Sequence, residues 1–272
     1  INGRKVNDLQ ELSQLNSGDI KNVEVITTPG AYYAADVKSV IRIRTKPPKG
    51  DGFSGILRSD NGFQHYFRTG NSLDLKYRTG GLEIFANYGW WRGNTRFDRL
   101  NDMNTTTSKG TYRQFVSTIG KESYNDMTGK LGFSYMINDL HSIGAYYQNS
   151  WNRHNTDGTI PSEIWQDGIL LDLYNSDVHN QSTAVPRHYA NIYYNGIVGK
   201  LNIDFNADYI WYKSRELTFN NELSEMGNDR EVNSSSINRN RMFAEKLVMT
   251  YPLWKGQIEI GEEYTNTRTT NL

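Results

Sequence analysis

The sequence of 272 residues contains no cysteine, which excludes disulfide-built domains, cysteine nucleophiles and thiolate metal sites. It has no excess of charge, because 30 acidic side chains balance 30 basic ones. A neutral chain gives no electrostatic reason to expect nucleic acid as a partner. It also lacks an apolar run near the roughly 18 residues of a membrane-spanning helix, and an apolar signal-peptide core at its start. Two classes remain: a soluble protein, or one that crosses a membrane with strands.

What the sequence does have is alternation of apolar and polar residues, which is the period of a β-strand. In the segment 200–212 the odd-numbered positions from Leu201 to Trp211 are apolar or aromatic, whereas Asn202, Asp204, Asn206 and Asp208 lie between them. The same period recurs along the chain. It predicts nine strands, over residues 52–60, 68–78, 81–91, 127–137, 141–151, 188–198, 200–212, 241–251 and 256–266.

Short turns are expected near Gly80, Asn138, Gly199 and Pro252, where Gly, Asn, Asp or Pro separates two predicted strands. Between them lie polar segments, which we expect to be long loops: 92–126, 152–187 and 213–240. Alternation of short turns and long loops, with strands of about ten residues, is typical of a transmembrane barrel. The sequence therefore predicts an all-β, antiparallel meander of long strands, part of a transmembrane β-barrel.

Aromatic residues cluster where the predicted strands meet the long polar segments. They form three groups: Tyr88, Trp90 and Trp91; Tyr147 and Trp151; and Tyr209, Trp211 and Tyr212. Tyr and Trp gather where hydrocarbon meets water, because their rings are apolar and their edges polar. The clusters favour an aromatic girdle, although strands favour aromatic residues in any case.

The opening stretch follows different rules. Residues 7–15 predict a short helix, and 20–46 predict a strand, a turn at Pro29-Gly30 and a second strand. The order "DIKNVEVITTPGAYYAADVKSVIRIRTK" resembles the C-terminal half of the plug domain of TonB-dependent outer-membrane receptors, within the subgroup of outer-membrane β-barrel proteins. The glycine-rich segment usual in that family is replaced here by residues 34–41. The matching positions are Ile20, Val23, Glu24, Val25, Ile26, Pro29, Val40, Ile41, Ile43, Thr45 and Lys46.

The resemblance implies two domains: the end of a small α+β plug in residues 1–48, and the N-terminal part of an outer-membrane barrel in 49–272. Since the family's barrel has twenty-two strands, we expect the chain to be a fragment. The resemblance also implies a Gram-negative outer membrane, lipid around the barrel, and nutrient import driven by the inner-membrane TonB complex, whose contact segment would lie upstream of Ile1. In the hairpin we expect Glu24 to be buried and paired with Arg42 or Arg44.

Motifs for catalysis are absent from the sequence: it has no phosphate-binding loop, nucleotide fingerprint, serine elbow or HExxH. We therefore expect neither an enzyme nor a cofactor. His154 and Asp157 could contact a metal, but a solvated pair in a loop is the simpler interpretation. Glu262 and Glu263 are neighbours in a strand and point to opposite faces, so they are no acid pair, and Glu263 is expected to face the lumen.

Ligand contact is expected in the long polar segments. Trp151, Arg153, Trp165 and Tyr174 offer a stacking surface for an external nutrient such as a glycan, a peptide or a metal chelate. The alternative is a loop packed by its own rings. Two other functions stay open: a soluble or surface-exposed β-rich ligand-binding module without transport activity, and an outer-membrane enzyme that uses acidic lumenal residues.

Overall fold

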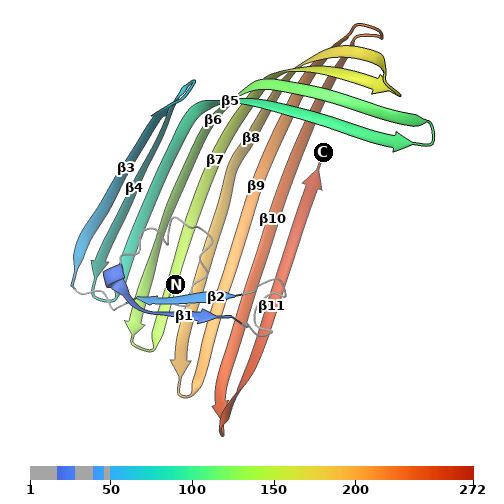
Figure 1. Ribbon diagram of the computed structural model, residues 1–272. Helices are drawn as coiled ribbons and strands as arrows, with labels where there is room; N and C mark the ends of the chain where they lie inside the picture. The colour runs from blue at the N-terminus through green and yellow to red at the C-terminus, as the bar shows by residue number, and fades with distance from the viewer. Residues whose placement is uncertain (1–16, 28–38, 46–49) are drawn as a thin grey trace.

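The computed structural model describes residues 17–27, 39–45 and 50–272 (Figure 1). A single turn of 3-10 helix, Ser17–Asp19, precedes eleven strands. The helix expected over residues 7–15 lies outside the described residues. No helix in the described part is long and apolar enough to cross a membrane. The strands are β1 (Ile20–Ile26), β2 (Val40–Thr45), β3 (Gly52–Phe63), β4 (Phe67–Thr79), β5 (Leu82–Thr107), β6 (Gly110–Asn138), β7 (His141–Gln166), β8 (Ile169–Val198), β9 (Leu201–Ser224), β10 (Arg230–Leu253) and β11 (Gly256–Asn271).

Strands β3 to β11 form one sheet in which every strand pairs antiparallel with its neighbours in sequence. This confirms the predicted all-β antiparallel meander and its nine strands. Four short turns, near Gly80, Asp139, Gly199 and Trp254, lie at one end of the sheet (Figure 1). Here Gly80 and Gly199 have positive φ, a conformation that glycine adopts without strain.

The three long loops were predicted wrongly, because the polar segments 92–126, 152–187 and 213–240 continue the strands. Strands β5 to β10 are 24 to 30 residues long, far beyond the five or six of an average strand. These segments lack apolar alternation, but their backbone groups still need partners, and the adjacent strands supply them. We call the three parts beyond Trp90, Trp151 and Trp211 the extended hairpins.

The sheet is a single curved layer with an inner and an outer face (Figure 1). Hairpin β1–β2 lies in the hollow, and Arg42 on β2 interacts electrostatically with Asp204 on β9, which assigns Asp204 to the inner face. Residues directly opposite each other share a face, so register extends this assignment across the sheet. On β9 the predicted split is confirmed: Asn202, Asp204, Asn206 and Asp208 are inner, and Leu201, Ile203, Phe205, Ala207 and Tyr209 are outer.

Polar side chains on the inner face hydrogen-bond to one another along the sheet. Tyr146 donates to the hydroxyl of Tyr189 (3.1 Å), which donates to Asp208 (2.6 Å). Asn191, also buried, donates to Asp208 (2.6 Å), and the ammonium of Lys130 lies 4.4 Å from the ring centroid of Tyr146. Glu263 lies on the same face and pairs with Lys246 (3.4 Å), as predicted for a residue facing the lumen.

Apolar side chains cover the outer face and stay exposed. A single layer cannot bury them, and among the described residues no large side chain is fully buried. Below the extended hairpins, Glu245 on β10 and Glu262 on β11 are the acidic exceptions on this face. The exposed apolar set, between 38% and 76% exposed, comprises Leu57, Leu73, Tyr77, Ile84, Tyr88, Leu131, Phe133, Tyr135, Tyr147, Ile192, Tyr209 and Phe243.

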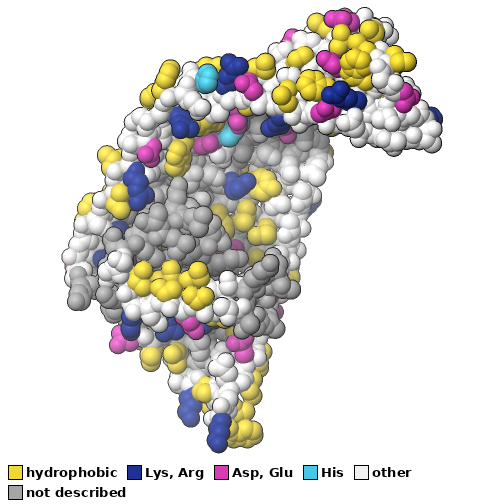
Figure 2. Space-filling model, in the orientation of Figure 1, with side chains coloured by type: hydrophobic (Ala, Val, Ile, Leu, Met, Phe, Trp, Pro, Cys, Tyr) yellow, Lys and Arg dark blue, Asp and Glu magenta, His cyan; other side chains and the backbone are white. Residues whose placement is uncertain are grey.

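The two-stranded sheet β1–β2 confirms the predicted hairpin. Glu24 lies opposite Arg42 and pairs with it at 3.8 Å, as expected, and Arg44 lies opposite Asn22. The expected burial of Glu24 is wrong, because its side chain is 53% exposed. Glu24 and Arg42 lie on the face of this hairpin that is turned to the nine-stranded sheet, and apolar residues such as Val25 lie on the other face. Figure 2 shows an apolar patch on the hairpin, in the hollow of the sheet. Pro29 and Gly30 lie outside the described residues.

Candidate functional site

The extended hairpins are closed by tight turns far from the four short turns (Figure 1). Strands β7 and β8 meet at Asp167-Gly168, where both residues have positive φ, at 50° and 83°. Two positive φ values are typical of the type I′ hairpin, for which Asp-Gly is a strong sequence signal. This signal could have identified the strands that were expected to be a loop. Strands β5 and β6 meet at Ser108-Lys109, and here the positive φ, 127°, belongs to the next residue, Gly110.

A groove of about 480 Å³ crosses the extended hairpins on the outer face. Its first row is Phe115, Glu163 and Leu173, which lie opposite one another on β6, β7 and β8. Its second row runs from Pro161 through Asn175 to Leu223 on β9. We call its apolar members Phe115, Pro161, Leu173 and Leu223 the floor, and the carboxylates of Glu163 and Glu225, which also line the groove, its rim. An apolar floor with a few polar groups is the usual composition of a small-molecule site.

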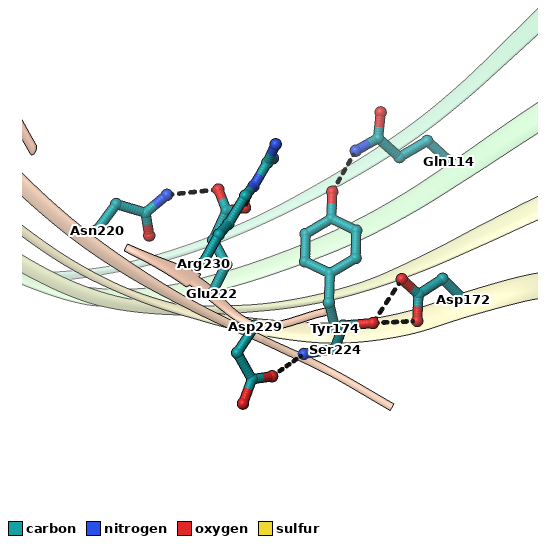
Figure 3. A network of polar contacts seen from close by, with 8 residues as sticks. All are labelled: Gln114, Asp172, Tyr174, Asn220, Glu222, Ser224, Asp229 and Arg230. Carbon is teal, nitrogen blue, oxygen red and sulfur yellow. Dashed lines mark hydrogen bonds and ion pairs between the residues drawn. The ribbon is translucent and has the colours of Figure 1, made fainter. Parts of the chain in front are cut away.

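Hydrogen bonds on the opposite face hold the strands that form this groove (Figure 3). Gln114 on β6 donates to the hydroxyl of Tyr174 on β8 (2.9 Å), and this contact passes over Ser162, which is only 4% exposed. Ser224 donates to both carboxylate oxygens of Asp172, at 2.9 and 2.8 Å. These bonds tie β6 to β8 and β8 to the end of β9. The groove therefore has fixed walls.

The turn between β9 and β10 is held by further polar contacts (Figure 3). Asp229 accepts from the backbone N–H of Ser224 (3.0 Å), and Asp172 accepts from that of Met226 (3.2 Å). Arg230 pairs with Glu222, and this contact raises the pKa of the guanidinium above its ordinary value. Such local bonds stabilise the edge of the groove where Glu225 stands.

The four residues expected to form one stacking surface do not come together. Trp151 and Arg153 lie at the foot of the β7–β8 hairpin, and Trp165 lies near its tip, roughly 40 Å away along the strand. Trp165 donates through Nε1 to Glu163 (3.0 Å) and so reaches the groove rim. Tyr174 is on the opposite face, in the network behind the groove. Of the four residues, Trp165 therefore contacts the groove through Glu163, and Tyr174 belongs to the hydrogen-bond network behind it.

The floor residues Phe115, Leu173 and Leu223 were missed by sequence reasoning. They are separated by about fifty residues of chain and share no local motif. Only pairing across β6, β7, β8 and β9 makes them neighbours. Register between strands is a property of the sheet, and a segment without clear alternation specifies it weakly.

A second, more open groove of about 510 Å³ lies nearer the foot of the extended hairpins. Its walls carry both signs of charge, including Arg96, Lys121 and Asp177. The ammonium of Lys121 is 5.0 Å from the ring centroid of Tyr66, and Thr159 donates to Asp177 (3.0 Å). Its polar groups already satisfy one another, so we regard the apolar groove as the better ligand site.

His154 and Asp157 do not form the solvated loop pair that the sequence suggested, because both lie on strand β7 and have different partners. The ring of His154 hydrogen-bonds to Glu122 and to Asp126, each at 3.0 Å, whereas Asp157 pairs with His179. Both ring nitrogens of His154 are thereby occupied. Burial alone would lower the pKa of His154, but the hydrogen bonds to the two carboxylates outweigh it and raise the pKa above 6.5. Within the described residues no group of three His, Asp or Glu is arranged to hold a metal ion.

Comparisons with known proteins gave weak likenesses only. No family model and no curated protein matches the chain. The solved structures that are similar to it include BauA, the ferric preacinetobactin receptor from Acinetobacter baumannii (12% identity, TM-score 0.39), and the siderophore receptor PiuA from the same organism (9%, 0.22), each over 93% of the chain. The chain spans about half the length of each, 48% and 51%.

Proposed function

We propose that this chain forms part of the wall of a Gram-negative outer-membrane β-barrel, in a TonB-dependent receptor that binds an external nutrient and imports it. Residues 49–272 would be the N-terminal part of the barrel, and 1–48 the end of its plug. The observation that carries the proposal is the division of the sheet into two faces. Apolar side chains cover the outer face, whereas hydrogen-bonded and charged groups line the hollow.

This division is the reverse of what water-soluble sheets require. A soluble sheet packs its apolar face against a second layer, and none of the other described residues forms a second layer on the outer face of the nine-stranded sheet. Burying the exposed apolar set would contribute on the order of 15 kcal/mol, at about 1 to 2 kcal/mol for each side chain. Lipid supplies that burial, and a polar lumen suits the inner face. The soluble binding module is disfavoured for the same reason.

The aromatic residues agree with this orientation. Trp90, Trp151 and Trp211 lie on the outer face where the extended hairpins begin, whereas Trp91 and Tyr212 point inward. Tyr88, Tyr147 and Tyr209 share the outer face, so the girdle would be formed by six of the eight aromatic residues of the predicted clusters. The extended hairpins then project beyond one lipid boundary, and the apolar groove on them would meet the external nutrient.

Single cysteines test the proposal cleanly, because the chain has none of its own. The full-length protein is expected in the outer-membrane fraction. A membrane-soluble maleimide should label L131C and Y209C on the outer face, and a water-soluble one should label Q148C and N206C on the inner face. Equal labelling of both sets by either reagent would contradict a barrel wall. Energy-dependent uptake of a metal chelate, peptide or glycan would then identify the cargo.

A further inference from the structure

One short pattern recurs on the three strands that run from the short turns toward the extended hairpins. A tryptophan is followed two residues later by a cation: Trp90 and Arg92 on β5, Trp151 and Arg153 on β7, and Trp211 and Lys213 on β9. Positions two apart share a face, so each cation lies on the outer face, about 7 Å further along the strand than its indole.

Other cations extend this row on the same face of the sheet. Arg92, Arg153 and Arg215 occupy one row of the ladder, joined through Asn125 and Thr183. Lys213 lies directly opposite Arg239, and Arg241 lies opposite both Trp211 and Arg268. We call these residues the cation belt: Arg92, Arg153, Lys213, Arg215, Arg239, Arg241 and Arg268.

The belt lacks the counter-charges that a soluble surface would carry. In the described part of the chain none of its seven members has an ion-pair partner, and six are exposed. The pairs Lys213–Arg239 and Arg241–Arg268 put like charges directly opposite each other, which destabilises a sheet unless an anion lies between them. Carboxylates at this level, such as Asp126 and Glu216, are on the inner face.

We propose that the cation belt binds the phosphates of anionic lipid headgroups in the leaflet that borders the extended hairpins. This inference rests on the proposed membrane location, and it adds a specific lipid partner. Indoles settle at the boundary between hydrocarbon and water, so a side chain about 7 Å beyond them reaches the headgroup layer. Guanidinium groups bind phosphate through two parallel hydrogen bonds.

A lipid surface fits this belt better than a soluble anion does. The seven cations spread along five strands of one outer face, and none lines either groove described above. A free phosphate would contact one or two of them, whereas a leaflet presents phosphates to all seven at once. The belt also lies next to the exposed apolar set, where lipid chains would lie.

The test uses full-length protein in an uncharged detergent, titrated with phosphatidylglycerol or with phosphatidylcholine, and bound lipids are counted by native mass spectrometry. The belt variant is R92Q/R153Q/K213Q. The matched control is K109Q/K200Q/K255Q, which removes three exposed cations at turns. A cation near an anionic surface changes binding about fivefold, so the belt variant should bind phosphatidylglycerol about a hundredfold more weakly. The control should stay within about threefold of the wild type.

Two further measurements separate the outcomes. R92K/R153K keeps the charge and should retain phosphatidylglycerol, and inorganic phosphate at equal concentration should not displace it. Equal affinity of the wild type and the belt variant for phosphatidylglycerol would overturn the proposal that the cation belt binds anionic headgroups. No preference for phosphatidylglycerol over phosphatidylcholine would overturn it as well. Failure of the wild type to insert into vesicles would instead overturn the proposed function. If the triple variant does not assemble, R153Q alone should lower affinity about fivefold.

Discussion

A charge placed on the outer face gives the sharpest test of the barrel wall. Leu131 lies on β6, is 60% exposed, and is surrounded on its face by Ala86 and Tyr147. If this face meets lipid, Leu131→Arg places a guanidinium near the middle of the bilayer. Outer-membrane barrels lose about 2 to 4 kcal/mol of folding free energy for such a change. The folding equilibrium should therefore shift by roughly thirtyfold to a thousandfold.

The matched control is Gln148→Arg, one strand away and at the same level. Leu131 is opposite Tyr147, and the next residue on each strand, Lys130 and Gln148, forms the adjacent pair on the inner face. Arginine at 148 would meet lumenal water and one like charge, which costs well under 1 kcal/mol. The two variants thus insert the same group at one depth on opposite faces.

The assay is reversible unfolding of the full-length protein in phospholipid vesicles by guanidinium chloride, followed by tryptophan fluorescence. Leu131→Gln and Leu131→Ala separate the charge from the lost apolar contact. A soluble sheet predicts a small cost for Leu131→Arg, because exposed surface substitutions usually fall within about 0.5 kcal/mol. If Leu131→Arg and Gln148→Arg agree within that margin, the outer face does not meet lipid.

Three more outcomes follow from the same geometry. Glu245→Leu should stabilise the protein in vesicles by about 1 kcal/mol, because it removes a carboxylate from the apolar outer face, and an unchanged or lowered unfolding midpoint would refute this. His154 has a raised pKa in the folded state, so its hydrogen bonds to Glu122 and Asp126 should stabilise the extended hairpins fully below pH 6.5 and progressively less as the pH rises through the folded pKa. Amide hydrogen exchange in these hairpins should therefore become faster with pH beyond its intrinsic pH dependence, and His154→Gln should remove that extra increase. Leu173→Asn in the groove floor should lower nutrient uptake roughly tenfold, whereas Leu217→Asn, outside the groove, should not, and equal uptake in the two would place the ligand elsewhere.

Deletion of residues 152–187 would not be a clean test of ligand contact. If that segment were a loop, its removal would leave the sheet intact. Because it forms much of β7 and β8, it pairs with β6 on one side and β9 on the other, so its removal would break ladder hydrogen bonds on both sides. Side-chain substitutions in the groove are therefore preferable.

Local alternation in the sequence determined much of this fold. In the segment around Leu201 and Asp208, alternation alone predicts which side chains share a face, because successive residues in a strand point to opposite sides. No knowledge of the partner strands is needed for this. Gly80 and Gly199 marked hairpin turns for an equally local reason, since they accept positive φ. An arginine partner for Glu24 was also predictable, because an acidic residue on one strand favours a basic one opposite it, but only the register chose Arg42 over Arg44.

The extended hairpins and the groove were decided only by the tertiary structure. The segment 104–111 is polar on both faces, and such a sequence looks the same whether it is a solvated strand or a loop. It forms a strand because the neighbouring strands offer a row of free backbone groups. These groups satisfy the hydrogen bonds of its own N–H and C=O groups. Phe115, Glu163 and Leu173 meet for that reason alone, because register between distant strands places them side by side.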